Sequence, residues 1–138
     1  MEMSATGDDS FEMRLKNAEG VPILRLGGNI TMTALKAVRF TLEKLASAGH
    51  FNVVLNIEQA QSANWRFLTG LADSVREFRE HHGMVDLVAT QERIQHLLRI
   101  DQIAQLFRLS GSEGQAISRI KRLTRDPDSI SDTDARLK

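Results

Sequence analysis

Residues 60–70 (AQSANWRFLTG) combine polar, aromatic and basic side chains where a strand is expected to lead into a helix. Asn64 is a good N-cap residue, because its side chain can accept a hydrogen bond from the first backbone N–H groups of a helix. Those N–H groups and the partial positive charge of a helix N-terminus also stabilise anions such as phosphate. Trp65 comes next, and an indole has no hydroxyl that could be phosphorylated. The stretch therefore predicts a binding site that is not modified by phosphorylation.

Trp65 and Arg66 belong to the residue types that are enriched at the energetic centres of protein interfaces. We interpret Trp65 as an aromatic anchor for a protein partner, with Arg66 beside it. The alternative is that Trp65 folds back over the sheet and fills space there. For Phe67 we expect packing, because it begins a stripe of apolar residues at helical spacing.

Ser62, Thr69 and Ser74 carry the hydroxyls nearest to Trp65. Ser62 is expected on a loop that a kinase could reach, whereas Thr69 and Ser74 are expected inside the helix. Loop hydroxyls commonly satisfy local backbone groups. We therefore expect no phosphorylation in this stretch, with Ser62 as the remote alternative.

The remaining polar residues do not form a pattern typical of an enzyme or a metal site. His81 and His82 are adjacent at a helix end, so their side chains point to different helix faces. Gly27 and Gly28 lack the spacing of a phosphate-binding loop and are expected to be turn residues. No nucleophile, base and orienting group can be assembled from the sequence. We expect a protein that is not an enzyme and that uses neither a metal nor a cofactor.

Length and charge limit the function classes further. The 138-residue chain has room for one domain with a hydrophobic core. Its 18 basic and 18 acidic residues balance, and the basic cluster near the end of the last helix has no interleaved aromatic residue for base stacking. The lack of cysteine fits a reducing compartment, and no signal peptide or apolar run of membrane-spanning length is recognisable. We expect a cytoplasmic protein that neither binds nucleic acid nor inserts into a membrane.

Alternating strand and helix patterns must position these residues. Residues 11–16 (FEMRLK) and 21–26 (VPILRL) indicate a hairpin whose first strand is half-buried. Further strands are indicated at three places: 51–57, 84–89 and 106–109. Helices are indicated by apolar residues three and four positions apart: around 35–45, at 64–82 closed by Gly83, after Thr90, and at 112–123. The predicted order is β-β-α-β-α-β-α-β-α.

Several residues are expected to cap these helices. Thr31 or Thr33 is expected to begin the first helix, which Gly49 ends. Ser112 and Gln115 form the signature of a capping box for the last helix. The helix after Thr90 is expected to point three residues inward: Ile94, Leu97 and Leu98.

The pattern predicts a single α/β domain over residues 11–123, with a mixed sheet opened by a hairpin and parallel crossovers after it. Residues 1–10 are expected to be a flexible N-terminus. Residues 124–138 (TRDPDSISDTDARLK) are rich in aspartate and serine and lack apolar periodicity. We expect them to form a disordered tail.

The order of the elements and four passages resemble the STAS domain family, which includes the anti-sigma-factor antagonists of bacteria and the cytoplasmic domains of sulphate transporters. The resemblance covers residues 11–123. The passages that carry it are ILRLGGNIT (23–31), VVLNI (53–57), IDQIAQLFRL (100–109) and SEGQAI (112–117). It implies a STAS-like single domain.

Family members that are regulated by phosphorylation carry a D-S-x-G-L sequence at the start of the helix after the third strand. The resemblance places Asn64 and Trp65 at the aspartate and the serine, and Phe67 at the glycine; only Leu68 matches. Thr31 stands at the position of an acidic residue that many relatives carry near the phosphorylation site. These departures together imply that the phosphorylation switch has been lost.

The resemblance implies a non-enzymatic protein of bacterial signalling, similar to an anti-sigma-factor antagonist. Its partner is expected to be an anti-sigma factor or serine-kinase-like protein, or another STAS-domain protein. The partner is expected at the N-terminus of the second helix, through six residues: Thr31, Ser62, Asn64, Trp65, Arg66 and Thr69. Two alternatives stay open: a STAS component that assembles into homo- or hetero-oligomers, and a small-ligand or nucleotide-binding domain.

Overall fold

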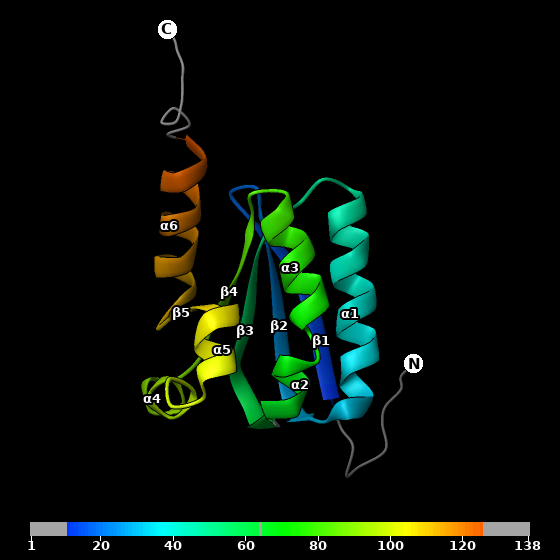
Figure 1. Cartoon of the computed structure of the whole chain (residues 1–138), viewed down its shortest axis with the longest axis vertical. Coiled ribbons are helices and arrows are strands. Elements are labelled where there is room, and N and C mark those ends of the chain that lie inside the picture. The colour runs from blue at the N-terminus through cyan, green and yellow to red at the C-terminus, as the bar shows by residue number, and fades with distance from the viewer. Residues whose placement is uncertain (1–10, 64, 126–138) are drawn as a thin grey trace, which may run out of the picture.

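A computed structural model describes residues 11–63 and 65–125, and the side chains of Ser62, Ala63, Trp65, Thr124 and Arg125 lie outside this description. Within these ranges the chain forms eleven elements (Figure 1): β1 (Phe11–Ala18), β2 (Val21–Ile30), α1 (Met32–Ser47), β3 (Asn52–Ala63), α2 (Trp65–Thr69), α3 (Ala72–Glu80), β4 (Met84–Val88), α4 (Gln91–Leu97), α5 (Asp101–Leu106), β5 (Arg108–Ser110) and α6 (Glu113–Arg125).

The five strands form one mixed sheet in the order β1-β2-β3-β4-β5. β1 and β2 pair antiparallel, and the other neighbours pair parallel. This arrangement confirms the predicted α/β sheet that opens with a hairpin. Each parallel crossover carries at least one helix, as parallel pairing requires.

Side chains alternate between the two faces of the sheet and build two cores. Leu24, Leu26 and Leu55 belong to the larger core, which α1, α2, α3 and α5 cover; Figure 1 shows α1, α2 and α3 in front of the strands. The smaller core lies under α6 and consists of Val21, Ile23, Val54, Val88, Ala116 and Ile120.

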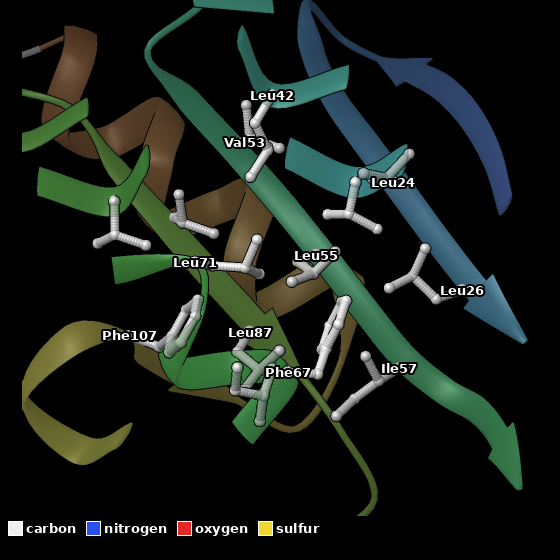
Figure 2. Packing of buried hydrophobic residues seen from close by; sticks show 14 of the residues in the cluster. Leu24, Leu26, Leu42, Val53, Leu55, Ile57, Phe67, Leu71, Leu87 and Phe107 are labelled. Atoms are coloured by element: carbon white, nitrogen blue, oxygen red, sulfur yellow. The ribbon is translucent and has the colours of Figure 1, made fainter. Parts of the chain in front are cut away.

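Phe67 of α2 is fully buried in the larger core. Figure 2 shows its ring beside Leu55, Ile57 and Leu87. The predicted packing role of Phe67 is therefore confirmed, and it fixes α2 against the sheet.

The single helix predicted over residues 64–82 is wrong, because the chain breaks into α2 and α3 at Gly70 and Leu71. A Cβ atom at position 70 would lie 2.7 Å from Cδ2 of Leu35 in α1, so the two helices approach closely here. The Leu71 N–H bonds to the Leu68 carbonyl, which tightens the turn. Both leucines are buried as a result.

The region after Thr90 also forms two short helices in place of one. Thr90 caps α4 as predicted, accepting from the N–H of Arg93 at 3.3 Å. Ile94 and Leu97 are buried, but the inward orientation predicted for Leu98 is wrong, since its side chain is 54% exposed. α4 ends at Leu97, and Ile103 of α5 fills the core instead.

Three further features differ from the prediction. β3 continues to Ala63, so Ser62 lies in a strand and its prediction as a loop residue is wrong. β1 is an edge strand, and Met13 and Leu15 are 36% and 53% exposed, so its half-buried interpretation is wrong. α6 continues to Arg125, two residues into the predicted tail. The predicted flexible N-terminus and residues 126–138 lie outside the described residues.

The predicted caps of the first and last helices are confirmed. Thr31 is the N-cap of α1, and Gly49 follows its end at φ +90°, which favours glycine. The Ser112 hydroxyl accepts from the N–H of Gln115 at 3.1 Å. The Gln115 side chain accepts from the N–H of Gly111, one residue earlier than in a standard capping box.

Candidate functional site

The described chain segments that carry the predicted binding residues come together at the carboxyl ends of β2 and β3. Asn29 pairs with Ser62, and Ile30 pairs with Ala63. Thr31 follows directly, before α1 begins, while α2 begins two residues after Ala63. In parallel sheets ligands bind at this end of the strands, so this is the candidate site.

Two irregularities in the β2–β3 pairing set this alignment. The register shifts between Arg25 and Gly27, and again between Gly28 and Asn29, each time by an extra residue in β3. Gly28 has φ +79°, a backbone conformation that favours glycine. Bulges of this kind redirect side chains near functional sites. Gly27 and Gly28 lie inside β2 and pair with both neighbouring strands, so their prediction as turn residues is wrong.

Thr31 and Thr69 direct their hydroxyls toward their own helices. Thr31 Oγ1 accepts from the N–H of Thr33 at 3.3 Å. The Thr69 hydroxyl donates to the carbonyl of Arg66 at 3.1 Å. Both side chains are half-buried, so these two predicted residues shape the helix ends while they stay accessible.

Arg66 and Met32 supply the exposed side chains of this region. Arg66 is exposed on α2, and Met32, the first residue of α1, is 49% exposed. Met32 was missed from the sequence, since its position outside the apolar stripe of α1 gives no signal. We call this surface the α2 face and define it by its described residues: Thr31, Met32, Arg66 and Thr69. Asn64 and the side chains of Ser62 and Trp65 belong to the same chain segments but lie outside the described residues.

A charged cluster anchors the start of α6 across the smaller core. Arg25 of β2 donates from Nε and Nη2 to the two carboxylate oxygens of Glu113, each at 2.8 Å. Asn56 of β3 donates to Glu113 Oε2 at 2.5 Å. The hydrogen bond from Arg25 lowers the pKa of Glu113 despite partial burial. The carboxylate therefore holds α6 to two strands.

A second cluster lies deeper, around Asp86 of β4, whose side chain is fully buried. Asp86 Oδ1 accepts from Arg108 Nε at 3.0 Å and from Nη2 at 2.7 Å. Oδ2 lies 3.8 Å from Nη1 of Arg119 in α6 and accepts no hydrogen bond within the described residues. Burial raises the pKa of Asp86, and the two arginines oppose that rise.

The described residues contain neither a metal-binding cluster nor a membrane-spanning helix. Residues 11–63 and 65–125 contain no cluster of three or more histidine, aspartate or glutamate side chains that could hold a metal ion. No helix in the same ranges combines the length and apolar character needed to cross a membrane.

Comparisons with known proteins support the fold at low sequence identity. No family model matches the sequence, and no curated protein matches it either. An anti-sigma factor antagonist from Mycobacterium paratuberculosis aligns with a TM-score of 0.68 at 18% identity, over 85% of this chain and 99% of that protein. SpoIIAA in its unphosphorylated form aligns at 0.63 and 15% identity, over 80% of this chain and 98% of SpoIIAA.

The phosphorylated form of SpoIIAA, described as a Bacillus cell fate determinant, aligns with a TM-score of 0.61 at 15% identity. The alignment covers 79% of this chain and 99% of that one. All three comparisons span nearly the whole of the known protein. The chain therefore has the STAS-like fold of the anti-sigma factor antagonists, as expected from its sequence.

Proposed function

We propose that this chain is a non-enzymatic, anti-sigma-factor-antagonist-like protein of bacterial signalling that binds a partner protein through the α2 face. The proposal is carried by one observation: the chain has the fold of SpoIIAA, a protein known in phosphorylated and unphosphorylated forms, yet Trp65 begins α2. The family resemblance puts the phosphorylated serine at that position. Binding at this face is then permanent and not switched there by phosphate.

The described side chains of the α2 face suit protein binding. Met32 and Arg66 are exposed, and methionine and arginine are both enriched at protein interfaces. Phe67 and Leu68 are buried directly beneath, so α2 is held firmly from below. A rigid short helix with exposed residues loses little conformational entropy when a partner binds.

The partner in this proposal is an anti-sigma factor or serine-kinase-like protein, or a second type of STAS-domain protein, in the bacterial cytoplasm. Because Trp65 cannot accept phosphate, control has to act elsewhere. The abundance of either protein, competition between partners, or a switch on the partner itself can supply it.

The test is capture of partners from a native lysate by the tagged chain beside three variants: Trp65→Ala, Arg66→Ala and Arg122→Ala. We expect the first two to lose the same captured protein while their melting temperatures stay unchanged. If Trp65 is an interface hot spot, its loss costs about 2 kcal/mol of binding free energy, or about thirtyfold in affinity. Arg122 is exposed on α6 and serves as the matched control.

Two results contradict the proposal. One is unchanged capture by Trp65→Ala together with a lowered melting temperature, which assigns the indole to packing. The other is loss of capture by Arg122→Ala alone, which places the partner on α6.

A further inference from the structure

β1 forms an open edge of the sheet along its whole length. It pairs with β2 from Phe11–Gly28 to Ala18–Val21 without a register shift, and no described strand pairs with its other side. β5, at the opposite edge, has only three residues. Proteins usually shorten an edge strand, bulge it or place proline in it, because its unpaired backbone groups can pair with another chain. β1 uses none of these three devices; its protection is limited to the charged side chains of Glu12, Arg14 and Lys16 on one face.

Apolar side chains continue from the larger core out to this edge. Met13 and Leu15 stand opposite Leu26 and Leu24, which are buried. Met13 and Leu15 themselves are 36% and 53% exposed, because α1 touches this strand only at its margin. The Thr41 hydroxyl lies 3.8 Å from the sulfur of Met13. The α1 side of β1 is thus an apolar surface that is only partly covered.

The other side of β1 carries one acidic and two basic residues: Glu12, Arg14 and Lys16. Arg14 stands directly opposite Arg25, and Glu113 already occupies the guanidinium of Arg25. Within the described residues, neither Glu12 nor Arg14 forms an ion pair. Like charges opposite each other are unfavourable in a sheet, and no described carboxylate lies within ion-pair distance of Arg14 to offset this.

We propose that β1 pairs with β1 of a second copy of this chain, antiparallel about a two-fold axis, with Met13 opposite Met13. In this register Glu12 of each copy faces Arg14 of the other, and Phe11 faces Leu15. Each arginine gains the carboxylate that its own sheet does not provide. The two sheets join into one, and backbone hydrogen bonds form along both edges.

Charge excludes the neighbouring registers. Because side chains alternate, the pairing can shift only in steps of two residues if the apolar side chains are to stay on one face. Each such step moves the centre of the symmetric pair by one residue. Pairing centred on Arg14 sets Arg14 against itself, and pairing centred on Leu15 sets Arg14 against Lys16. The register centred on Met13 is the one that pairs opposite charges without a like-charge contact. None of these residues belongs to the α2 face, so this inference does not depend on the proposed function.

Sedimentation velocity of the full chain across a concentration series tests the proposal, with Glu12→Arg, Arg14→Glu and the double charge swap beside the wild type. We expect a wild-type dimer. Each single variant turns two attractive cross-strand contacts into repulsive ones and should raise the dimer Kd by about tenfold or more. The double swap should restore it to within about threefold of the wild type. The proposal is overturned if the chain is monomeric at every concentration, or if the single variants leave the dimer Kd unchanged.

Lys16→Glu is the matched control on the same face of β1. In the proposed register Lys16 has no charged residue of the second copy opposite it, so the Kd should change little. In the register centred on Arg14, Lys16 faces Glu12, and the substitution should weaken the dimer strongly. That result would refute the pairing through Met13.

The absence of cysteine from the chain allows a direct test of register by disulfide formation. Directly opposite residues have Cβ atoms close enough for a disulfide after small adjustments. Met13→Cys should therefore form a cross-linked dimer under mild oxidation, much faster than Leu15→Cys, which faces Phe11. Faster cross-linking at position 15 contradicts the proposed register.

Discussion

Replacing Asp86 with alanine should destabilise the fold by removing the anion beneath α6. Asp86 accepts two hydrogen bonds from Arg108, at 3.0 and 2.7 Å, and lies 3.8 Å from Arg119. Arg119 also donates to the hydroxyl of Ser110 at 2.7 Å. The substitution leaves two guanidinium groups against the smaller core without a carboxylate.

The expected cost follows from how deeply the partners are buried. Removing one member of a buried ion pair costs about 3–5 kcal/mol, because the other charge is left unpaired. The Arg108 and Arg119 side chains are 22% and 26% exposed, so water partly replaces the lost carboxylate. We therefore expect the free energy of unfolding to fall by the lower end of this range, about 3 kcal/mol. This is a large part of the stability of a typical domain, which is about 5–15 kcal/mol. The melting temperature should fall by about 10 °C.

Urea unfolding followed by circular dichroism gives the free energies for a double-mutant cycle of Asp86→Ala, Arg108→Met and the two together. Loss of either partner should be costly, whereas loss of both should cost far less than the sum, because only Arg119, which still donates to Ser110, then lacks the carboxylate. Effects that add to within about 0.5 kcal/mol would mean that the pair is not coupled. That outcome would refute the assignment of Asp86 as the anchor of β5 and α6.

Three further predictions concern other parts of the chain. Gly83→Ala should destabilise by about 3 kcal/mol or more, since the added Cβ would lie 1.8 Å from the backbone oxygen of Phe51; urea unfolding checks this, and a loss below about 1 kcal/mol would show that the contact relaxes easily. The lowered pKa of Glu113 means that its ion pair with Arg25 stabilises the fold above the usual carboxyl pKa of 4.5 and is lost as pH falls through the folded value. Glu113→Gln should therefore unfold with a flatter pH dependence below about pH 5, and identical pH curves would refute this. Incubation with a serine-kinase-like partner and ATP should place no phosphate in residues 60–70, and a phosphorylated Ser62 in the mass spectrum would contradict that expectation.

Local signals in the sequence were sufficient for the strands, the hairpin and the helix caps. Thr31, Thr90 and Ser112 all bond to backbone N–H groups two or three residues ahead, and such contacts are visible from spacing alone. The break at Gly70 was not predictable, because it depends on the close approach of Leu35 from another helix. Packing overrides helix propensity at such points.

The charged clusters under α6 were equally unpredictable from the sequence. Asp86 lies in the apolar run MVDLVA, which predicts only a strand. Its main partner Arg108 is 22 positions away, so no local pattern indicates the ion pair. Of the candidate site, the sequence predicted where the chain segments meet, because the element order fixes which strand ends are adjacent. It did not predict Met32, because a position outside the apolar stripe of α1 gives no signal in the sequence.

The most direct test of the central claim is the accessibility of the indole itself. Trp65 is the chain's single tryptophan, and there is no tyrosine, so intrinsic emission excited at the red edge of absorption reports on this position alone. Acrylamide quenching should be measured for the native and the urea-unfolded chain. An anchor that is ready for a partner predicts native quenching close to that of the unfolded chain. A native ring that acrylamide barely quenches would show that Trp65 is packed inside the fold, and it would contradict binding through this residue.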